Sequence, residues 1–200
     1  SVIIPTRNRA GFLKRTIDSL LDDPFPQKEI LVCDAASSDG TLELLESYGD
    51  RIQWLSEPDS GEYDARNKGL SLCTGDIIRF YSDDIVSIPG AFEEASARFL
   101  KDPELDLLFG HGELYYSSYN VAPTKMQMTT FQDFSVSLRN MIRQKTSIPP
   151  SETVFFRRRV IDNIGPFRQD ISNADNEFWV RALHSGCRAA VSETTFIRAE

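Results

Sequence analysis

The sequence predicts an α/β protein in which a mostly parallel sheet is flanked by helices. Apolar runs of strand length alternate with stretches whose apolar residues recur at helical spacing, which is the pattern of parallel βαβ units. A chain of 200 residues with 40% hydrophobic residues is long and apolar enough for one sizeable core. Because no internal repeat, low-complexity tract or linker divides it, we expect a single domain over residues 1–200.

The first half of the chain contains four predicted strands and four predicted helices. The strands cover residues 1–4, 29–33, 51–55 and 76–81. The helices cover residues 12–21, 41–49, 65–75 and 89–100. Gly49 and Gly75 end the second and third helices, and Pro89 is expected in the first turn of the fourth, where its missing N–H costs nothing.

The second half of the chain is less regular and is predicted to extend the same domain with a mixed segment. The apolar stretches at residues 105–109 and 113–118 are followed by a mixed segment to Ile148, then by the apolar stretch at 153–156 and a final predicted helix around residues 173–186. Ser1 lies inside a predicted strand and Glu200 inside another, so we expect the chain to be a portion of a longer protein.

Composition and missing motifs exclude several classes of function. The net charge of -8 argues against a general nucleic-acid or anionic-membrane surface, and no apolar run is long enough to cross a bilayer. Cys33, Cys73 and Cys187 lack metal-ligand spacing and are expected to be reduced thiols without a disulfide. His111 and His184 lack partners at zinc-ligand spacing. We expect a cytoplasmic protein, associated at most peripherally with the inner face of the membrane.

Two adjacent carboxylates, Asp83 and Asp84 in "FYSDDIVSIPG", follow the fourth predicted strand. Adjacent like charges repel, so a folded chain must supply a cation, hydrogen-bond donors or open solvent there. In a doubly wound sheet the ligand crevice lies outside the carboxyl ends of the strands, where Asp34, Asp59 and Asp64 would join this pair. Mg²⁺ or Mn²⁺ is the expected cofactor, because such hard cations are commonly held by one or two carboxylates plus substrate phosphates.

Five ordered motifs carry a resemblance to a known family. They are "SVIIPTRNR", "DAASSDGT", "SEPDSGEYDARNKGL", "TGDIIRFYSDD" and "ADNEFWVRA". Together they span nearly the whole chain and resemble the family-2 glycosyltransferases of the GT-A fold, which has a Rossmann-like, mostly parallel sheet. The resemblance implies a nucleotide-sugar-binding half over about residues 1–104 and a mixed acceptor-side half over about residues 105–200.

The resemblance also implies roles for residues of the first half. Asp83 and Asp84 take the place of the D-x-D motif, with Asp84 as metal ligand and Asp83 contacting the ribose or the metal; a solvated turn is the alternative. Asp34 would hydrogen-bond the nucleobase, or cap a loop or helix instead. The other implied donor contacts are the base-pocket residues Pro5, Thr6 and Arg7, and the residues Asp64, Arg66 and Lys68 near the base and diphosphate, which could equally be surface charges.

In the last motif, the resemblance implies that Asp175 is the general base of an inverting transfer. A carboxylate near a metal-bound diphosphate can take the proton of an attacking hydroxyl. Glu177 becomes the base if the alignment slips by two residues, and Asn173 or Asp175 could instead cap the helix. Phe178 and Trp179 are expected to be packing residues.

The expected function is an inverting, metal-dependent transfer of a sugar to an acceptor hydroxyl in glycan, polysaccharide or glycolipid synthesis. The expected donor is a UDP-sugar. A single-transfer enzyme is favoured, since the Q-x-x-R-W motif of processive relatives is absent. Two alternatives remain open. A sugar nucleotidyltransferase would bind its metal and nucleotide in a similar way, but this sequence has no glycine-rich G-x-G-T-R loop near the first strand. A non-catalytic nucleotide-sugar-binding module is favoured only if Asp175 lies far from the aspartate pair.

Overall fold

The computed structural model describes residues 1–114 and 150–199. Its first half holds four strands in parallel pairing, in the order β3-β2-β1-β4. These strands are β1 (Val2–Thr6), β2 (Ile30–Asp34), β3 (Gln53–Ser56) and β4 (Ile77–Phe80). β1 and β2 are buried along their whole length, as expected of central strands covered on both faces.

Four further strands extend the same sheet with mixed pairing. They are the short β5 (Ile85–Ser87) of the first half and, in the second half, β6 (Leu107–Leu114), β7 (Val154–Arg157) and β8 (Ala189–Ala199). β7 joins β4 antiparallel and is followed by β6, β8 and β5, so the described residues form one eight-stranded sheet. The predicted α/β fold, with a parallel first half and a mixed second half, is confirmed.

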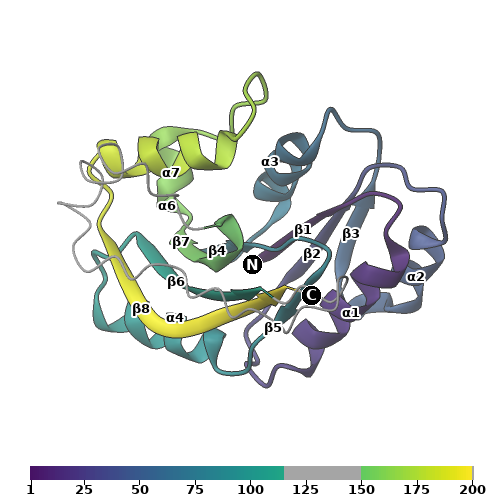
Figure 1. Ribbon diagram of the computed structural model, residues 1–200, viewed down its shortest axis with the longest axis horizontal. Coiled ribbons are helices and arrows are strands. Elements are labelled where there is room, and N and C mark those ends of the chain that lie inside the picture. The colour runs from purple at the N-terminus through teal and green to yellow at the C-terminus, as the bar shows by residue number, and fades with distance from the viewer. Residues whose placement is uncertain (115–149, 200) are drawn as a thin grey trace.

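Helices cover both faces of the sheet (Figure 1). One face carries α1 (Ala10–Asp22), α2 (Thr41–Ser47) and α4 (Ala91–Lys101). The other carries α3 (Glu62–Leu72), α6 (Arg159–Ile164) and α7 (Ala174–His184). Short 3₁₀ turns, Gly49–Arg51 and Ser151–Thr153, precede β3 and β7. Helix α7, which carries the predicted base Asp175, therefore lies on the same face as α3, which follows the predicted donor loop.

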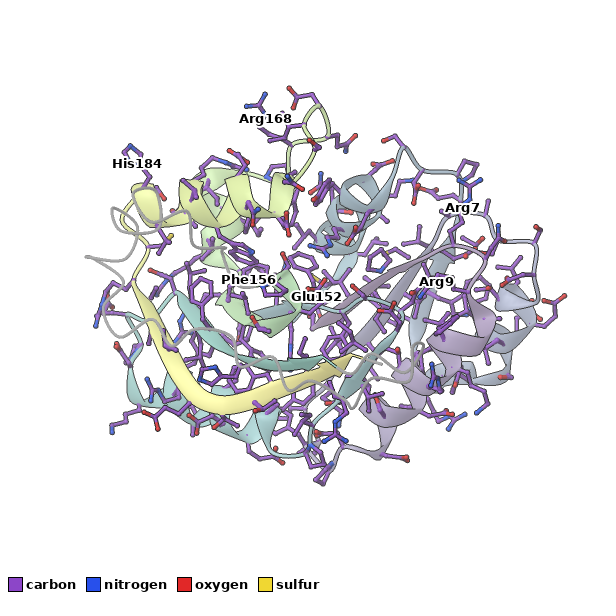
Figure 2. The ribbon with its side chains drawn as sticks, in the orientation of Figure 1. Arg7, Arg9, Glu152, Phe156, Arg168 and His184 are labelled. Carbon is purple, nitrogen blue, oxygen red and sulfur yellow. The ribbon has the colours of Figure 1, made fainter. Side chains whose placement is uncertain are left out.

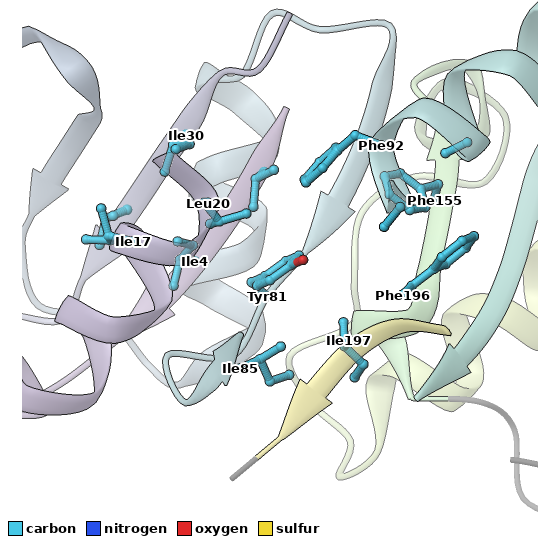
Figure 3. Packing of buried hydrophobic residues seen from close by; sticks show 14 of the residues in the cluster. Ile4, Ile17, Leu20, Ile30, Tyr81, Ile85, Phe92, Phe155, Phe196 and Ile197 are labelled. Carbon is cyan, nitrogen blue, oxygen red and sulfur yellow. The ribbon is translucent and has the colours of Figure 1, made fainter. Parts of the chain in front are cut away.

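Each face of the sheet has its own hydrophobic core. The core under α1, α2 and α4 joins Ile4 of β1 and Tyr81, which directly follows β4, to Phe92 of α4 and Phe196 of β8 (Figure 3). The core under α3, α6 and α7 combines aliphatic residues with aromatic residues that include Phe80 of β4, Phe156 of β7, and Phe178 and Trp179 of α7. Phe178 and Trp179 are fully buried there, which confirms that they are packing residues.

Several predicted element boundaries are wrong. Pro89 is not in a helical turn, because α4 begins at Ala91 after Gly90, whose φ of 91° places it in the left-handed region that glycine adopts without strain. α3 begins at Glu62 and ends at Leu72, so Gly75 does not end it. β5 was not expected at all. Most of the apolar stretch at 113–118 and the mixed segment that follows it to Ile148 lie outside the described residues.

The packing of α3 on β1 depends on the absence of a side chain at Gly69. A Cβ there would lie 2.4 Å from Ile3 Cγ2 and 3.1 Å from Cys33 Sγ. We expect Gly69→Ala to lower the free energy of unfolding by about 1–3 kcal/mol through overpacking, offset in part by alanine's better helix propensity. Urea unfolding measures this change. Gly11→Ala in α1 is the matched control, because a Cβ at Gly11 meets nothing within 4 Å, and an equal loss in both variants would contradict the packing argument.

Candidate functional site

A pocket of about 610 Å³ opens at the carboxyl ends of the parallel strands. It is lined by the loop after β1, the loop that leads into α3, and residues 82–84 after β4. The volume lies in the range of small-molecule sites, about 300–1,000 Å³. The predicted residues Pro5, Thr6, Arg7, Asp83 and Asp84 all line this pocket.

The parallel register explains why these residues meet. Thr6 pairs with Asp34 at the ends of β1 and β2, and Ile3 pairs with Phe80 in β1 and β4. The three strands therefore end at one edge, and the loops that follow them converge, as expected for the crevice of an open α/β sheet.

The aspartate pair is held by the side chains of Thr6 and Arg9, and the single positive charge of Arg9 offsets one of the two carboxylate charges. Thr6 Oγ1 donates to Asp83 Oδ2 at 2.8 Å, while Arg9 Nε donates to Asp83 Oδ1 at 2.7 Å and Arg9 Nη2 to Asp84 Oδ2 at 2.8 Å. Burial raises the pKa of Asp83 above its ordinary value; the Thr6 hydrogen bond and the Arg9 charge oppose this rise, and Asp84 adds to it. One guanidinium thus bridges both carboxylates in charge-assisted hydrogen bonds.

Sequence reasoning did not identify Arg9 as a site residue. Its guanidinium lies 4.5 Å from the centre of the Phe12 ring, and Figure 2 shows Arg7 and Arg9 close together beyond β1. The signal was the second arginine of "PTRNR", two residues after the predicted pocket residue Arg7. The adjacent carboxylates required hydrogen-bond donors or a cation. Arg9 was therefore a candidate donor, because it lies in a loop predicted to face the aspartate pair.

The donor set of the pocket fits a divalent cation that shares its ligands with a substrate. Asp84 has a 38% exposed side chain and, among the described residues, an Oδ1 atom with no hydrogen bond. Asp83 is more buried and has both oxygens engaged. In residues 1–114 and 150–199 no group of three or more His, Cys, Asp or Glu side chains could hold a metal alone. One or two carboxylates completed by phosphate oxygens is the arrangement that Mg²⁺ accepts.

Asp34 lies at the end of β2, behind the pocket wall, which its neighbour Ala35 lines. The carboxylate is buried and accepts hydrogen bonds from the backbone N–H and hydroxyl of Ser37, and from Ser56 Oγ at 2.6 Å. A carboxylate has about four acceptor positions, so three are used and one remains on Oδ1. The structure thus shows the alternative loop-capping contacts for Asp34.

The predicted donor contacts on α3 do not line the pocket. Asp64 accepts from Ser60 N at 3.0 Å and lies 3.6 Å from Lys68, which also pairs with Glu57. Arg66 is buried and forms ion pairs with Glu62 and with Glu152, the latter at 3.2 Å.

Glu152 is a second residue that sequence reasoning missed. It precedes β7 near the centre of the molecule (Figure 2) and accepts a hydrogen bond from Ser82 Oγ at 2.9 Å. Ser82 lines the pocket beside the aspartate pair, so Glu152 joins the buried Arg66 to the pocket wall. The sequence carried no signal for this contact, because Glu152 follows a segment without clear periodicity.

Asp175 lies in the first turn of α7, outside the residues that line the pocket, and contacts α3. Tyr63 Oη donates to Asp175 Oδ1 at 3.2 Å. Glu177, the other candidate base, is held by Arg181 at 2.8 Å and 3.1 Å. Asn173 precedes α7 with a φ of 62°, and its side chain makes no capping hydrogen bond. Of the two acids, Asp175 is the one without an ion pair among the described residues.

The remaining polar candidates lie elsewhere. His184 ends α7, at the opposite side of the molecule from Arg7 and Arg9 (Figure 2). Cys33 and Cys73 are buried free thiols, and burial raises the pKa of Cys33 to about 12, which keeps it protonated and unreactive. Within the described part of the chain, no helix combines the length and apolarity that a membrane crossing requires.

Comparison with known proteins places this site in a family context. Residues 1–165 match the family model for "Glycosyl transferase family 2". The chain is 26% identical over 193 residues to the glycosyltransferase AglE of Haloferax volcanii, a match that covers 93% of this chain and 62% of AglE. It is 32% identical over 112 residues to the chondroitin synthase of Pasteurella multocida, covering 54% of this chain and 12% of that protein. The chain therefore spans less than two thirds of the length of these relatives.

Solved structures share the fold. TarS 1–349 of S. aureus in complex with UDP-GlcNAc matches with a TM-score of 0.76 and 22% identity, over 99% of this chain and 57% of that one. The mannosyltransferase PcManGT from Pyrobaculum calidifontis, in complex with GDP-Man and Mn²⁺, matches with a TM-score of 0.72 and 20% identity, over 98% of this chain and 55% of that one. The eight-stranded α/β sheet is thus that of the GT-A glycosyltransferases. Since the family model covers most of the chain, the predicted resemblance is confirmed, and the chain belongs to glycosyl transferase family 2.

Proposed function

We propose that this protein catalyses an inverting, metal-dependent transfer of a sugar from a UDP-sugar to an acceptor hydroxyl. The observation that carries the proposal is the pocket at the strand ends, in which Asp83 and Asp84 face a space of about 610 Å³. Family membership supports a nucleotide-sugar donor, and related structures hold UDP-GlcNAc or GDP-Man. The proposed acceptor is a hydroxyl of a glycan, polysaccharide or glycolipid, and the proposed compartment is the cytoplasm.

The proposed chemistry is a single displacement. Asp175 accepts the proton of the acceptor hydroxyl, whose oxygen forms a bond to the anomeric carbon. The bond from that carbon to the diphosphate oxygen breaks, and its electron pair leaves with the nucleoside diphosphate. Because attack and departure occur on opposite faces of the sugar, the configuration inverts. Asp175 is preferred over Glu177 since the Glu177 carboxylate is held by Arg181.

The leaving diphosphate requires positive charge. A Mn²⁺ or Mg²⁺ ion, when bound, would supply Lewis-acid stabilisation of the charge that develops there. Asp84 is its proposed ligand, and Asp83 the proposed contact to the ribose or to the same ion. Among the basic groups, Arg7 and Arg9 line the pocket and are better placed to contact phosphate than Arg66, which is buried between two glutamates.

Transfer is tested by offering UDP- and GDP-sugars with Mn²⁺ and simple glycoside acceptors, with product analysis. The proposal predicts release of UDP and formation of a glycoside of inverted configuration. Release of pyrophosphate instead would identify a nucleotidyltransferase. Binding of a nucleotide sugar without turnover of any acceptor or of water, in the parent chain, would favour a non-catalytic binding module.

Asp34 is proposed to select uracil through the acceptor position that its Ser37 and Ser56 contacts leave unused. We expect the parent to bind UDP more tightly than GDP. Asp34→Ala should weaken UDP binding by roughly 10- to 100-fold, since a charge-assisted hydrogen bond contributes about 1.5–3 kcal/mol. Calorimetry with UDP and GDP measures the ratio.

Ser56→Ala is the control for Asp34→Ala. It removes a hydrogen bond to Asp34 but leaves the carboxylate, so the preference for UDP over GDP should persist. Thermal unfolding of both variants separates a loss of fold from a loss of recognition. A parent that prefers GDP, or an Asp34→Ala variant with the parental ratio, contradicts the assignment.

A further inference from the structure

The proposed base is tied to the donor half of the site through a tyrosine. Tyr63 lies in the first turn of α3, directly after Gly61 and Glu62, which line the pocket. Its hydroxyl donates to Asp175 Oδ1 at 3.2 Å across 112 residues of sequence. The same helix thus carries part of the donor pocket wall and a hydrogen-bond donor to the carboxylate of α7.

The two oxygens of Asp175 have different surroundings. Oδ1 accepts from Tyr63 Oη and from the backbone N–H of Asn176 at 2.9 Å. Among the described residues, no donor hydrogen-bonds to Oδ2. A general base must offer one oxygen to the incoming proton while its orientation stays fixed. The two hydrogen bonds to Oδ1 fix the orientation of the carboxylate and leave Oδ2 to face the acceptor hydroxyl.

The Tyr63 ring is itself held in place by packing. It stacks on Phe167 with ring centres 5.8 Å apart, and Phe167 stacks on Phe178 of α7 at 4.2 Å. The buried Arg66 guanidinium lies 5.8 Å from the centre of the Tyr63 ring. The hydroxyl therefore projects from a ring whose position does not depend on the hydrogen bond that it makes.

A second contact joins the same two segments. Gln169, in the loop before α7, accepts from Ser60 Oγ at 3.3 Å and donates to Asp64 Oδ1 at 3.2 Å. Ser60 lines the donor pocket. The donor loop and the segment that leads into α7 are thus linked on both sides of Tyr63, so the Tyr63 hydroxyl lies within a fixed interface.

We propose that Tyr63 is a positioning residue that orients the Asp175 carboxylate toward the acceptor and couples it to the donor pocket. The inference rests on the proposed role of Asp175 as base. Tyr63 exchanges no proton in the reaction; it acts through Asp175. A small misplacement of a reacting group can lower turnover by up to about 10²-fold, so loss of one of two orienting hydrogen bonds should lower kcat by roughly tenfold.

The test is Tyr63→Phe, which keeps the stacked ring and removes only the hydroxyl. We expect kcat to fall by roughly tenfold, while KM for the donor and calorimetric UDP affinity stay at the parental value. Tyr48→Phe is a matched control, because Tyr48 Oη also donates to an aspartate, Asp18 Oδ1 at 2.8 Å, and Tyr48 packs in the core under α1, α2 and α4, on the opposite face of the sheet. That control should keep the parental kcat.

A double-variant cycle shows whether Tyr63 acts through Asp175. If it does, Tyr63→Phe adds no further loss of kcat in an Asp175→Asn background. Parental kcat in Tyr63→Phe, or the same tenfold loss in both backgrounds, overturns the inference and leaves the proposed base intact. Parental kcat in Asp175→Asn overturns the base assignment, and with it the role of Tyr63. Absence of transfer by the parent chain overturns the proposed function itself.

Discussion

Replacement of Asp175 by asparagine is expected to lower turnover by roughly 10²-fold or more while UDP affinity stays nearly unchanged. Asparagine keeps the size of the side chain and an oxygen that can accept from Tyr63, but it removes the basicity that deprotonates the acceptor. The donor pocket is lined by other residues, so nucleotide binding should not suffer. Steady-state kinetics at saturating donor, with calorimetry of UDP binding, measures both quantities.

Glu177→Gln is the matched control for the base assignment. The Glu177 carboxylate pairs with Arg181 within α7, so its loss should weaken a partly buried contact within the helix and change turnover little. Near-parental transfer by Asp175→Asn together with abolished transfer by Glu177→Gln would identify Glu177, and not Asp175, as the base. If neither variant is impaired, the base lies on another element.

The affinity for UDP is expected to depend on a divalent cation, and Asp84→Ala is expected to abolish that dependence. Without a cation, Arg9 offsets only one of the two carboxylate charges, and the remaining negative charge repels the diphosphate. With Mn²⁺ present, we expect the parent to bind UDP roughly tenfold or more tightly than in excess chelator, consistent with charge-assisted contacts of about 1.5–3 kcal/mol. Calorimetry under both conditions provides the ratio.

Asp50→Ala controls for the loss of one negative charge. Asp50 is exposed on the 3₁₀ turn before β3 and does not line the pocket, so the cation dependence should remain parental. Equal UDP affinity in Mn²⁺ and in chelator for the parent, or an unchanged ratio in Asp84→Ala, would contradict the metal assignment. If Asp84→Ala and Asp50→Ala both lose the difference between UDP affinity in Mn²⁺ and in chelator, the cause is a general effect of charge and not the loss of a metal ligand.

The parallel half of the fold could be predicted because its signals are local. Strands β1, β2 and β4 are short, largely apolar runs, and α1 between β1 and β2 shows clear 3.6-residue periodicity. β5 has only three residues, and it exists because Ile85 pairs with Ala199 far along the chain. Pro89 looked like a helix start, but Gly90 provides the left-handed residue from which α4 begins. Such outcomes depend on tertiary pairing, which a window of sequence does not contain.

For the site, positions were easier to predict than partners. The ends of β1 and β4 follow from the strand pattern, so Thr6, Asp83 and Asp84 could be placed at one edge of the sheet. Arg9 lies 74 residues before Asp83, and Tyr63 lies 112 residues before Asp175. Hydrophobic periodicity does not indicate which arginine or tyrosine makes these long-range contacts.

The bridge from Arg9 to both aspartates sets a cation and a guanidinium in competition for the same carboxylates. In the protein alone, Arg9 already supplies a countercharge to the pair. A cation on Oδ1 of Asp84 therefore meets a carboxylate whose charge Arg9 already shares, which weakens the binding of the cation alone. A diphosphate in the pocket offers the guanidinium a second anionic partner. By linkage, nucleotide and cation then strengthen each other's binding, and the donor site is expected to fill with both together.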